Sequence, residues 1–163
     1  MSSSVAIIDY GLCNLDSIYR AVVECGGKAN ITADPQSVVH ADRCILPGVG
    51  AFTQAMKNIR SASLDEAIRE HVFSHARPFL GICLGMHLMG DIGEEGEGAT
   101  GLKLIPSKIV RLVPAGPHER VPHVGWNTVE PTTNSTLLAG IRAGTDFYFV
   151  HSYHMQCDNE SDI

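Results

Sequence analysis

The segment Gly81-Ile82-Cys83-Leu84-Gly85 carries the clearest chemical signal in the sequence. It has the spacing of a nucleophile elbow, G-x-S-x-G, with a thiol in place of the hydroxyl. An elbow turns a buried strand sharply into a helix, which strains the central residue and requires small residues two positions before and after it. The thiol would stand at the carboxyl end of a parallel sheet, where ligands bind, and near a helix N-terminus that favours the thiolate. We therefore interpret Cys83 as a nucleophile rather than as a buried structural cysteine.

The turn Pro47-Gly48-Val49-Gly50 also follows a predicted strand and precedes a predicted helix. It is not a dinucleotide-binding fingerprint, because the third glycine is missing and the turn lies too deep in the chain. A glycine-rich turn beside the elbow can point backbone N–H groups at the thiol. Together with the N–H of Leu84, these groups would stabilise the oxyanion of a thioester-forming reaction. The alternative interpretation is a plain tight turn.

Three further features have chemically capable side chains. His151-Ser152-Tyr153-His154 precedes Cys157, but residues three apart on a strand point to opposite faces, so we predict a strand edge lining a cleft and no metal site. Trp126, the single tryptophan, belongs either to the core or to an interface. Glu94-Glu95 lies either in a solvated loop or against a cationic group of a substrate.

The elements that must position these residues follow from the hydrophobic pattern. Apolar runs at 5–8, 44–46 and 79–82 have the length of buried strands, and each is followed by helical spacing, the last to about residue 90. A Ser63–Glu66 capping box predicts one more helix. Strands alternating with helices predict a parallel sheet covered on both faces.

The pattern changes after residue 91. An acidic, glycine-rich loop at 93–101 precedes predicted strands at 108–113, 121–130 and 146–154, which are separated by turns and partly antiparallel. No repeat or linker divides the chain, so 1–163 is predicted to be a single domain.

Composition excludes several classes of protein. The 163 residues are 44% hydrophobic and 18% charged, which is typical of a globular domain. A net charge of −6 without a Lys/Arg run argues against nucleic-acid or anionic-membrane partners. No apolar stretch approaches the roughly 20 residues of a membrane span, and the start lacks a signal peptide. Five cysteines without CxxC pairs predict a reducing, cytoplasmic location and no zinc ribbon.

Four segments then occur in one order at suitable spacing: 46–52, 81–86, 121–127 and 147–153. Together they resemble the class I (triad) glutamine amidotransferases over essentially the whole chain. The segment Val-Pro-His-Val-Gly-Trp-Asn at 121–127 resembles the HisH branch, the subunits that supply ammonia in imidazole glycerol phosphate synthase. The resemblance implies a flavodoxin-like, three-layer α/β fold around a mostly parallel sheet, incomplete at its C-terminus.

The same resemblance implies a mechanism and site residues. Cys83 would attack the side-chain amide of glutamine, release ammonia and form a thioester that water hydrolyses to glutamate, with no cofactor or metal. The implied oxyanion hole consists of the backbone N–H groups of Val49, Gly50 and Leu84. The residues implied to bind glutamine are Gly50, His87, Glu95, His151, Ser152 and Tyr153. The ammonia would pass to a cyclase subunit, a (β/α)8 barrel, which Tyr10, Asn14, Trp126 and Tyr148 would face.

The chain departs from the family pattern at two places. The family has glutamine four residues after the nucleophile, where this chain has His87. The family's triad His and Glu lie in a His-Pro-Glu motif some tens of residues further on, and no histidine after Cys83 here is followed by Pro-Glu. We therefore expect the sequence to be a shortened form of a longer chain or, if it is a natural end, a pseudo-enzyme.

Three alternatives remain open. A relative of the HisH branch could supply ammonia for amino-sugar synthesis in surface polysaccharides, which the segment 144–154 also resembles. A non-catalytic subunit could bind the cyclase without hydrolysing glutamine. A flavodoxin-like redox protein could use a reactive elbow cysteine, although the segments 47–50 and 122–127 argue against it.

Overall fold

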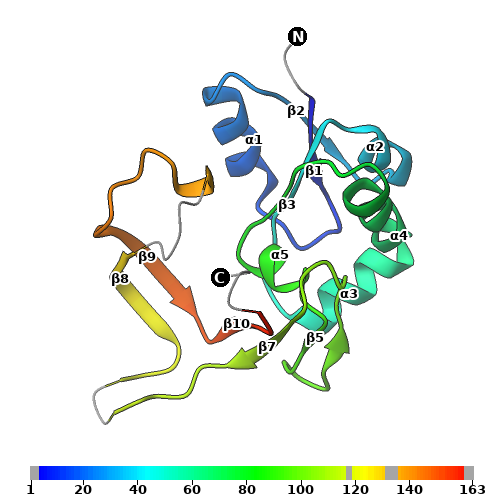
Figure 1. The fold of residues 1–163 in the computed structure, drawn as a ribbon. Coiled ribbons are helices and arrows are strands. Elements are labelled where there is room, and N and C mark those ends of the chain that lie inside the picture. Colours follow the sequence, from blue (N-terminus) through cyan, green and yellow to red (C-terminus); the bar gives the residue numbers. More distant parts are fainter. Residues whose placement is uncertain (1–3, 117–118, 131–135, 160–163) are drawn as a thin grey trace.

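A four-stranded parallel sheet organises the first half of the chain (Figure 1). The computed structural model describes residues 4–116, 119–130 and 136–159. The strands are β1 (Ser4–Ile8), β2 (Lys28–Thr32), β3 (Arg43–Leu46) and β4 (Phe79–Gly81), in the order β2-β1-β3-β4. Leu46 lies opposite Gly81 in the register of β3 and β4. The turns that follow these two strands therefore meet at one edge of the sheet.

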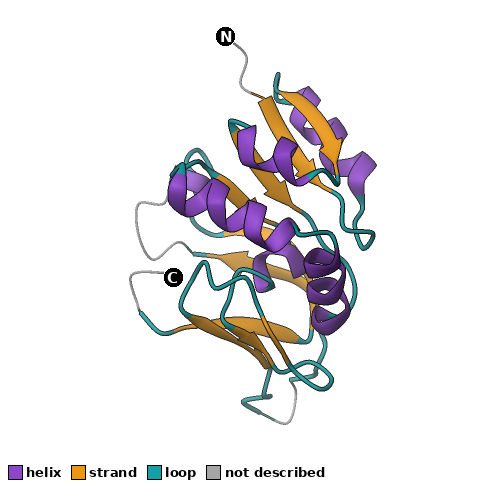
Figure 2. Ribbon diagram, turned by 90° about the vertical axis from the view of Figure 1, so that its right-hand side faces the viewer, coloured by secondary structure: helices purple, strands orange, loops and turns teal. Residues whose placement is uncertain are grey.

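Helices cover both faces of this sheet, as Figures 1 and 2 show. Helix α1 (Leu15–Glu24) lies on one face. On the other lie α2 (Pro35–His40), α3 (Phe52–Ser61) and α4 (Leu64–Arg69), the last continuing into a π-helical turn at Glu70–Ser74. The predicted three-layer α/β class with a parallel sheet is therefore confirmed.

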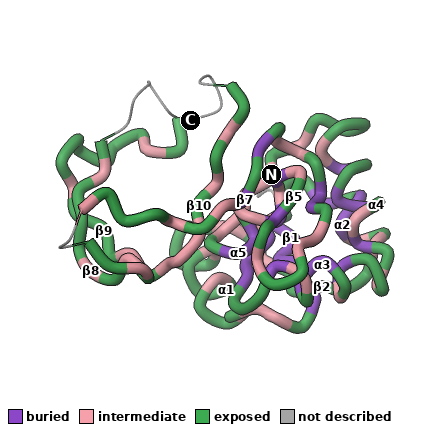
Figure 3. Tube along the Cα trace, turned by 90° about the horizontal axis from the view of Figure 1, so that it is seen from below, coloured by how far each residue is buried: buried purple, intermediate pink, exposed green. Residues whose placement is uncertain are grey.

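The hydrophobic core is concentrated on the α2–α4 side, where the buried segments of Figure 3 gather. Fully buried side chains there include Leu46, Phe52, Met56, Ile59 and Ile68, and burying each contributes about 1.5–3 kcal/mol. No residue of α1 is buried. Instead, an apolar groove of ≈ 550 Å³ separates α1 from the sheet, and Val5, Ile18, Val22, Ile45, Leu80 and Ile82 are among the residues that line it.

The second half of the chain is antiparallel in part, as predicted. A mixed sheet has the order β10-β7-β5-β6, and its strands are β5 (Ile92–Gly93), β6 (Ala99–Thr100), β7 (Ser107–Arg111) and β10 (Tyr153–Cys157). Strands β8 (His123–Val129) and β9 (Thr145–His151) form an antiparallel hairpin that extends away from the parallel sheet (Figures 1 and 3). A 3-10 turn lies at Thr136–Leu138. The single strand predicted at 146–154 is divided at Ser152 into β9 and β10.

Two local predictions about helix ends are wrong. Helix α5 (Leu84–His87) ends at His87 rather than near residue 90. Ser63 precedes α4 but has a left-handed backbone with φ 54° and makes no side-chain cap hydrogen bond, so there is no capping box. The observed side-chain cap is at α2, where the carboxylate of Asp34 accepts from the N–H of Ser37 at 2.9 Å.

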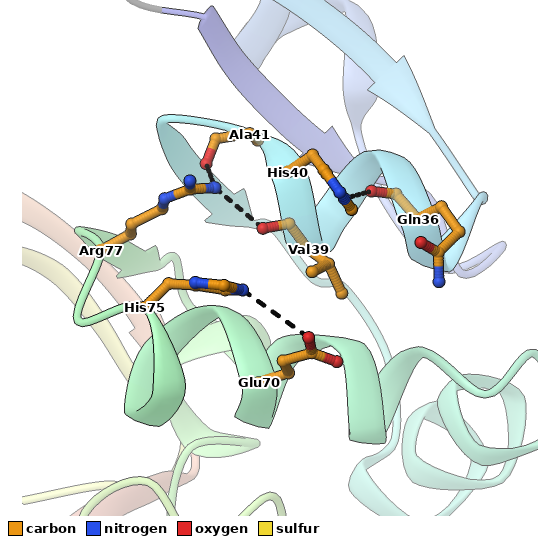
Figure 4. Close-up of polar contacts among 7 residues, drawn as sticks. All are labelled: Gln36, Val39, His40, Ala41, Glu70, His75 and Arg77. Carbon is orange, nitrogen blue, oxygen red and sulfur yellow. Dashed lines mark hydrogen bonds and ion pairs between the residues drawn. The ribbon is translucent and has the colours of Figure 1, made fainter.

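The connection into β4 is held against α2 (Figure 4). The guanidinium of Arg77 donates to the carbonyls of Val39 and Ala41 at 2.9 and 2.8 Å, which satisfies carbonyls at the end of α2. A nearby ion pair between His75 and Glu70, 3.6 Å long, is largely exposed and adds little stability. Arg77 thus fixes the entry to the strand that carries the elbow.

In the described part of the chain, no helix is long and apolar enough to cross a membrane.

Candidate active site

Cys83 occupies a strained turn between β4 and α5. Its backbone angles are φ 53° and ψ −117°, outside the regions that a side-chain-bearing residue normally adopts. Such a conformation costs on the order of 1–3 kcal/mol and persists where the surroundings impose it. Cys83 is exposed. The strand, the strained turn and the helix predicted for a nucleophile elbow are all present.

The two flanking glycines explain why the elbow needs small residues. A Cβ at Gly85 would overlap the carbonyl oxygen of Leu46, because α5 packs directly on the end of β3. A Cβ at Gly81 would lie 2.6 Å from the Cα of Met86. Both neighbours are backbone atoms, so neither can move aside without shifting an element.

The short helix changes the electrostatic prediction for the thiol. Helix α5 has four residues, so its macrodipole is small, and stabilisation of a thiolate depends on individual N–H groups of its first turn. The N–H of Gly85 already donates to the carbonyl of Ile82 at 2.9 Å. The N–H of Leu84, the first helical residue, is the donor best placed to serve Cys83.

The turn at 47–50 is held by the loop that follows β1. The N–H of Val49 donates to the carbonyl of Leu12 at 2.9 Å, and the thiol of Cys13 donates to the carbonyl of Pro47 at 3.6 Å. The predicted orientation of the Val49 N–H toward Cys83 is therefore not met in this conformation. Nothing in the sequence identified Leu12, because its role depends on a contact between distant segments.

A pocket of ≈ 470 Å³ brings the predicted site residues together. It is lined by Val49, Gly50, Cys83, Leu84, His87, Glu95, Pro122, Val150, His151, Ser152 and Tyr153. All the residues predicted for the oxyanion hole and for glutamine binding are in this set. Pro122 and Val150, at the base of the hairpin, were not singled out by sequence analysis.

Glu95 reaches this pocket from the loop after β5. Its Oε2 atom accepts from the N–H of Phe52 at 2.8 Å, and its own carbonyl accepts from the hydroxyl of Thr53 at 3.1 Å. The carboxylate therefore satisfies the first N–H of α3, whose N-cap residue Ala51 has no side-chain acceptor. These bonds orient the carboxylate at the rim of the pocket.

A family model described as "Glutamine amidotransferase class-I" matches residues 6–162, nearly the whole chain. The chain belongs to the class I glutamine amidotransferases. This membership agrees with the elbow geometry of Cys83 and with the α/β fold.

Curated relatives of this amidotransferase are imidazole glycerol phosphate synthase subunits named HisH. The protein from Moorella thermoacetica is 48% identical, over 93% of this chain and 70% of the relative. HisH 2 of Nitrobacter winogradskyi is 43% identical, over 98% of this chain and 77% of the relative. These relatives are therefore longer than the region they share with this chain.

Solved structures show the same fold at low sequence identity. A protein from Thermoplasma acidophilum that is described as a GMP synthase component has a TM-score of 0.64 at 15% identity, covering 95% of this chain and 67% of that one. A glutamine amidotransferase from Thermotoga maritima has a TM-score of 0.59 at 16% identity, covering 96% of this chain and 64% of that one.

His87 stands where the resemblance implies a glutamine. Burial, together with the nearby positive charges that His151 and His154 can carry, lowers the pKa of His87 to about 4. The imidazole is therefore neutral at pH 7. A neutral imidazole has one N–H donor and one nitrogen acceptor, so it can replace both functions of a glutamine amide.

The lowered pKa of His87 predicts a pH-dependent stability. Between pH 6.5 and pH 4 this imidazole binds a proton in the unfolded chain but not in the folded one, so the free energy of unfolding falls as the pH falls through this window. Between pH 7 and pH 4.5, we expect the free energy of unfolding to fall by ~1–2 kcal/mol less in His87→Gln than in the wild type. The difference is limited to this size because the ring keeps partial contact with water. Urea unfolding of both proteins at pH 7 and pH 4.5 measures the difference. An identical loss of stability in both proteins would contradict the prediction.

The residues predicted to face a partner differ in exposure. Trp126 and Tyr148 are 72% and 56% exposed, lie opposite each other on β8 and β9, and meet edge to face with ring centroids 5.6 Å apart. Asn14, at the N-cap of α1, is also exposed. Tyr10 is buried, at 5% exposure, so its side chain does not face a partner in this conformation, contrary to the prediction.

The phenol of Tyr10 is unusual for a buried group. Its hydroxyl has no hydrogen-bond partner among the described residues and lies so close to Gly48 that a Cβ there would overlap it. Burial raises the pKa of Tyr10 above its usual range, and the thiols of Cys13 and Cys83 add to the shift. The neutral phenol therefore packs directly beneath the turn at 47–50.

The described residues contain no group of three or more histidine, cysteine, aspartate or glutamate side chains arranged to hold a metal ion. His151 and His154 lie on different strands, β9 and β10, on either side of the break at Ser152.

Proposed function

We propose that this chain is the glutaminase subunit of imidazole glycerol phosphate synthase. It hydrolyses the side-chain amide of glutamine to glutamate and ammonia, and the ammonia passes to a cyclase subunit with a (β/α)8 barrel. The observation that carries this proposal is Cys83, exposed on a strained elbow at a pocket with the predicted glutamine-binding residues. The HisH relatives at 43–48% identity support a role in histidine biosynthesis and an assembly with a second subunit.

The proposed reaction has two steps on one sulfur atom. The thiolate of Cys83 attacks the carboxamide carbon, and the N–H of Leu84 stabilises the oxyanion. The C–N bond then breaks, the nitrogen takes up a proton and ammonia leaves. Water attacks the resulting thioester, releases glutamate and restores the thiol. For Val49 to contribute a second donor, its N–H must leave the carbonyl of Leu12.

The two imidazoles that line the pocket are poor bases for this reaction. His87 has a pKa of about 4, so transfer of the thiol proton to it is strongly unfavourable. Both ring nitrogens of His151 have partners, the carbonyl of Tyr153 at 2.9 Å and the ring of His123 at 3.2 Å. This observation favours a second candidate function, in which the subunit binds glutamine and the cyclase but does not hydrolyse glutamine.

Labelling with a glutamine-shaped electrophile tests the proposal. We expect 6-diazo-5-oxo-L-norleucine to modify Cys83 and spare Cys25, which is also exposed, whereas iodoacetamide should modify both. An excess of L-glutamine should protect Cys83 from the analogue and should leave the labelling of Cys25 by iodoacetamide unchanged. Labelling of Cys83 by iodoacetamide but not by the analogue would overturn the proposal. Glutamate release in the presence of the cyclase subunit then separates the glutaminase from the non-catalytic candidate.

The exposed pair Trp126 and Tyr148 is the proposed contact with the cyclase. A large aromatic side chain at the centre of an interface commonly contributes 2 kcal/mol or more to binding, so we expect Trp126→Ala to raise the dissociation constant by about 30-fold. The melting temperature should not change, because Trp126 is mostly exposed in the free chain. Calorimetric titration with the cyclase subunit measures the dissociation constant of Trp126→Ala. Phe73→Ala, which removes another exposed aromatic side chain, is the control. An equal loss of affinity in Trp126→Ala and Phe73→Ala would contradict the prediction that the hairpin contacts the cyclase.

A further inference from the structure

Three aromatic rings gather at the base of the hairpin, next to the pocket. His123 and His151 are direct cross-strand neighbours, and the ring of Phe149 stacks on His123 with centroids 5.2 Å apart and planes 20° apart. His123 and His151 meet nearly edge to face, at 69°. The stack holds the ring of His123 in one plane and directs its edge at His151.

The hydrogen bonds of His151 define where its proton lies. Its Nδ1 atom is 2.9 Å from the carbonyl oxygen of Tyr153, and a carbonyl oxygen only accepts, so Nδ1 carries the hydrogen. In a neutral imidazole the other nitrogen, Nε2, is then an acceptor. It lies 3.2 Å from Nδ1 of His123, which must therefore donate. The directions run in one sense, from His123 to His151 to the Tyr153 carbonyl.

This chain of hydrogen bonds ends on the backbone that lines the pocket. His151, Ser152 and Tyr153 all lie on the wall of the cavity that contains Cys83. The carbonyl of Ser152 accepts from the N–H of Leu112 at 2.8 Å, and the carbonyl of Tyr153 accepts from His151. Both carbonyls at the break between β9 and β10 are thus fixed, one by the backbone just after β7 and one by a side chain.

We propose that His123 is a positioning residue of the glutamine pocket. Its Nδ1–H favours the same tautomer of His151 as the Tyr153 carbonyl does, and so strengthens the bond that holds the 151–153 backbone beside Cys83. The role in binding glutamine rests on the proposed function. The two hydrogen bonds from His123 to His151 to the Tyr153 carbonyl, here called the relay, rest on the geometry alone. Without the donor, only the Tyr153 carbonyl favours this tautomer, so the other tautomer becomes populated and in it the carbonyl loses its partner.

Two variants separate the ring of His123 from its donor. His123→Phe keeps a ring to stack on Phe149 and removes the N–H. His123→Asn removes the ring but keeps an amide N–H close to the place of Nδ1. Long-range ¹H–¹⁵N correlation spectra report the tautomer of each histidine, with the His151 signals assigned by their loss in His151→Gln. We expect the Nδ1–H tautomer of His151 in the wild type and in His123→Asn, and a mixture of tautomers in His123→Phe. An unchanged His151 tautomer in His123→Phe would overturn the relay.

The functional half of the proposal has its own readout. In His123→Phe the concentration of 6-diazo-5-oxo-L-norleucine that half-saturates Cys83 labelling should rise about tenfold, the factor that corresponds to one lost hydrogen bond. Labelling by iodoacetamide should not change, and His123→Asn should behave as wild type. A half-saturating concentration equal to that of the wild type would overturn the positioning role. If the wild type is not labelled by the analogue, the proposed function fails, and the tautomer spectra still decide the relay.

Discussion

Replacing Cys83 by serine is expected to lower labelling by 6-diazo-5-oxo-L-norleucine by at least about 10³-fold. A serine hydroxyl is far less ionised than a thiol at neutral pH, and the pocket supplies no imidazole suited to take its proton. Mass spectrometry of the intact protein after timed exposure to the analogue gives the rate. The fold should persist, because Cys83 is exposed and its neighbours pack through Gly81 and Gly85.

A matched control for this variant is available in the same chain. Cys25, at the C-cap of α1, is also an exposed free thiol. Cys25→Ser should leave labelling by the analogue unchanged, and both variants should bind the cyclase subunit as the wild type does. Retained labelling in Cys83→Ser would assign the nucleophile to another residue and sink the proposed mechanism.

Replacing Gly85 by alanine is expected to destabilise the fold by about 3–5 kcal/mol, among the largest effects of a single substitution. The added methyl would overlap the carbonyl of Leu46, and this carbonyl also accepts from the N–H of Ile82 at 3.0 Å. Relieving the overlap must separate α5 from β3 or break the bond that holds the elbow to the sheet. Urea unfolding monitored by circular dichroism measures the loss.

Gly116→Ala is the control for this substitution. A Cβ at Gly116 would have no atom within 4 Å, so the change should stay within about 0.5 kcal/mol of the wild type. Equal stability of the two variants would show that α5 can move away from β3 at little cost. The elbow would then deform at a lower cost in free energy than its backbone contacts indicate.

The two variants separate chemistry from architecture at the same turn. Cys83→Ser removes the reacting atom and leaves the packing, whereas Gly85→Ala leaves the thiol and disturbs the packing that strains it. A Gly85→Ala protein that still folds should therefore react more slowly with the analogue, because its Cys83 no longer needs the positive φ of 53°.

Features encoded by neighbouring residues were accessible from the sequence. The elbow is one of these, because Gly81, Cys83 and Gly85 determine it by their own steric demands within five positions. The alternation of strands and helices is another, because hydrophobic period follows from backbone geometry. The antiparallel character of the second half also followed from its turns and short strands.

Features that depend on distant segments were decided only by the tertiary structure. The N–H of Val49 donates to Leu12 instead of facing the thiol, the carboxylate of Glu95 caps α3, and His123 orients His151. Tyr10 lies under the turn at 47–50 rather than at the surface. Each is a hydrogen bond or a contact between residues far apart in the chain, whose partners are selected by how the layers pack. Sequence pattern specifies the elements and the nucleophile, but a directional bond exists only once packing has fixed both of its ends.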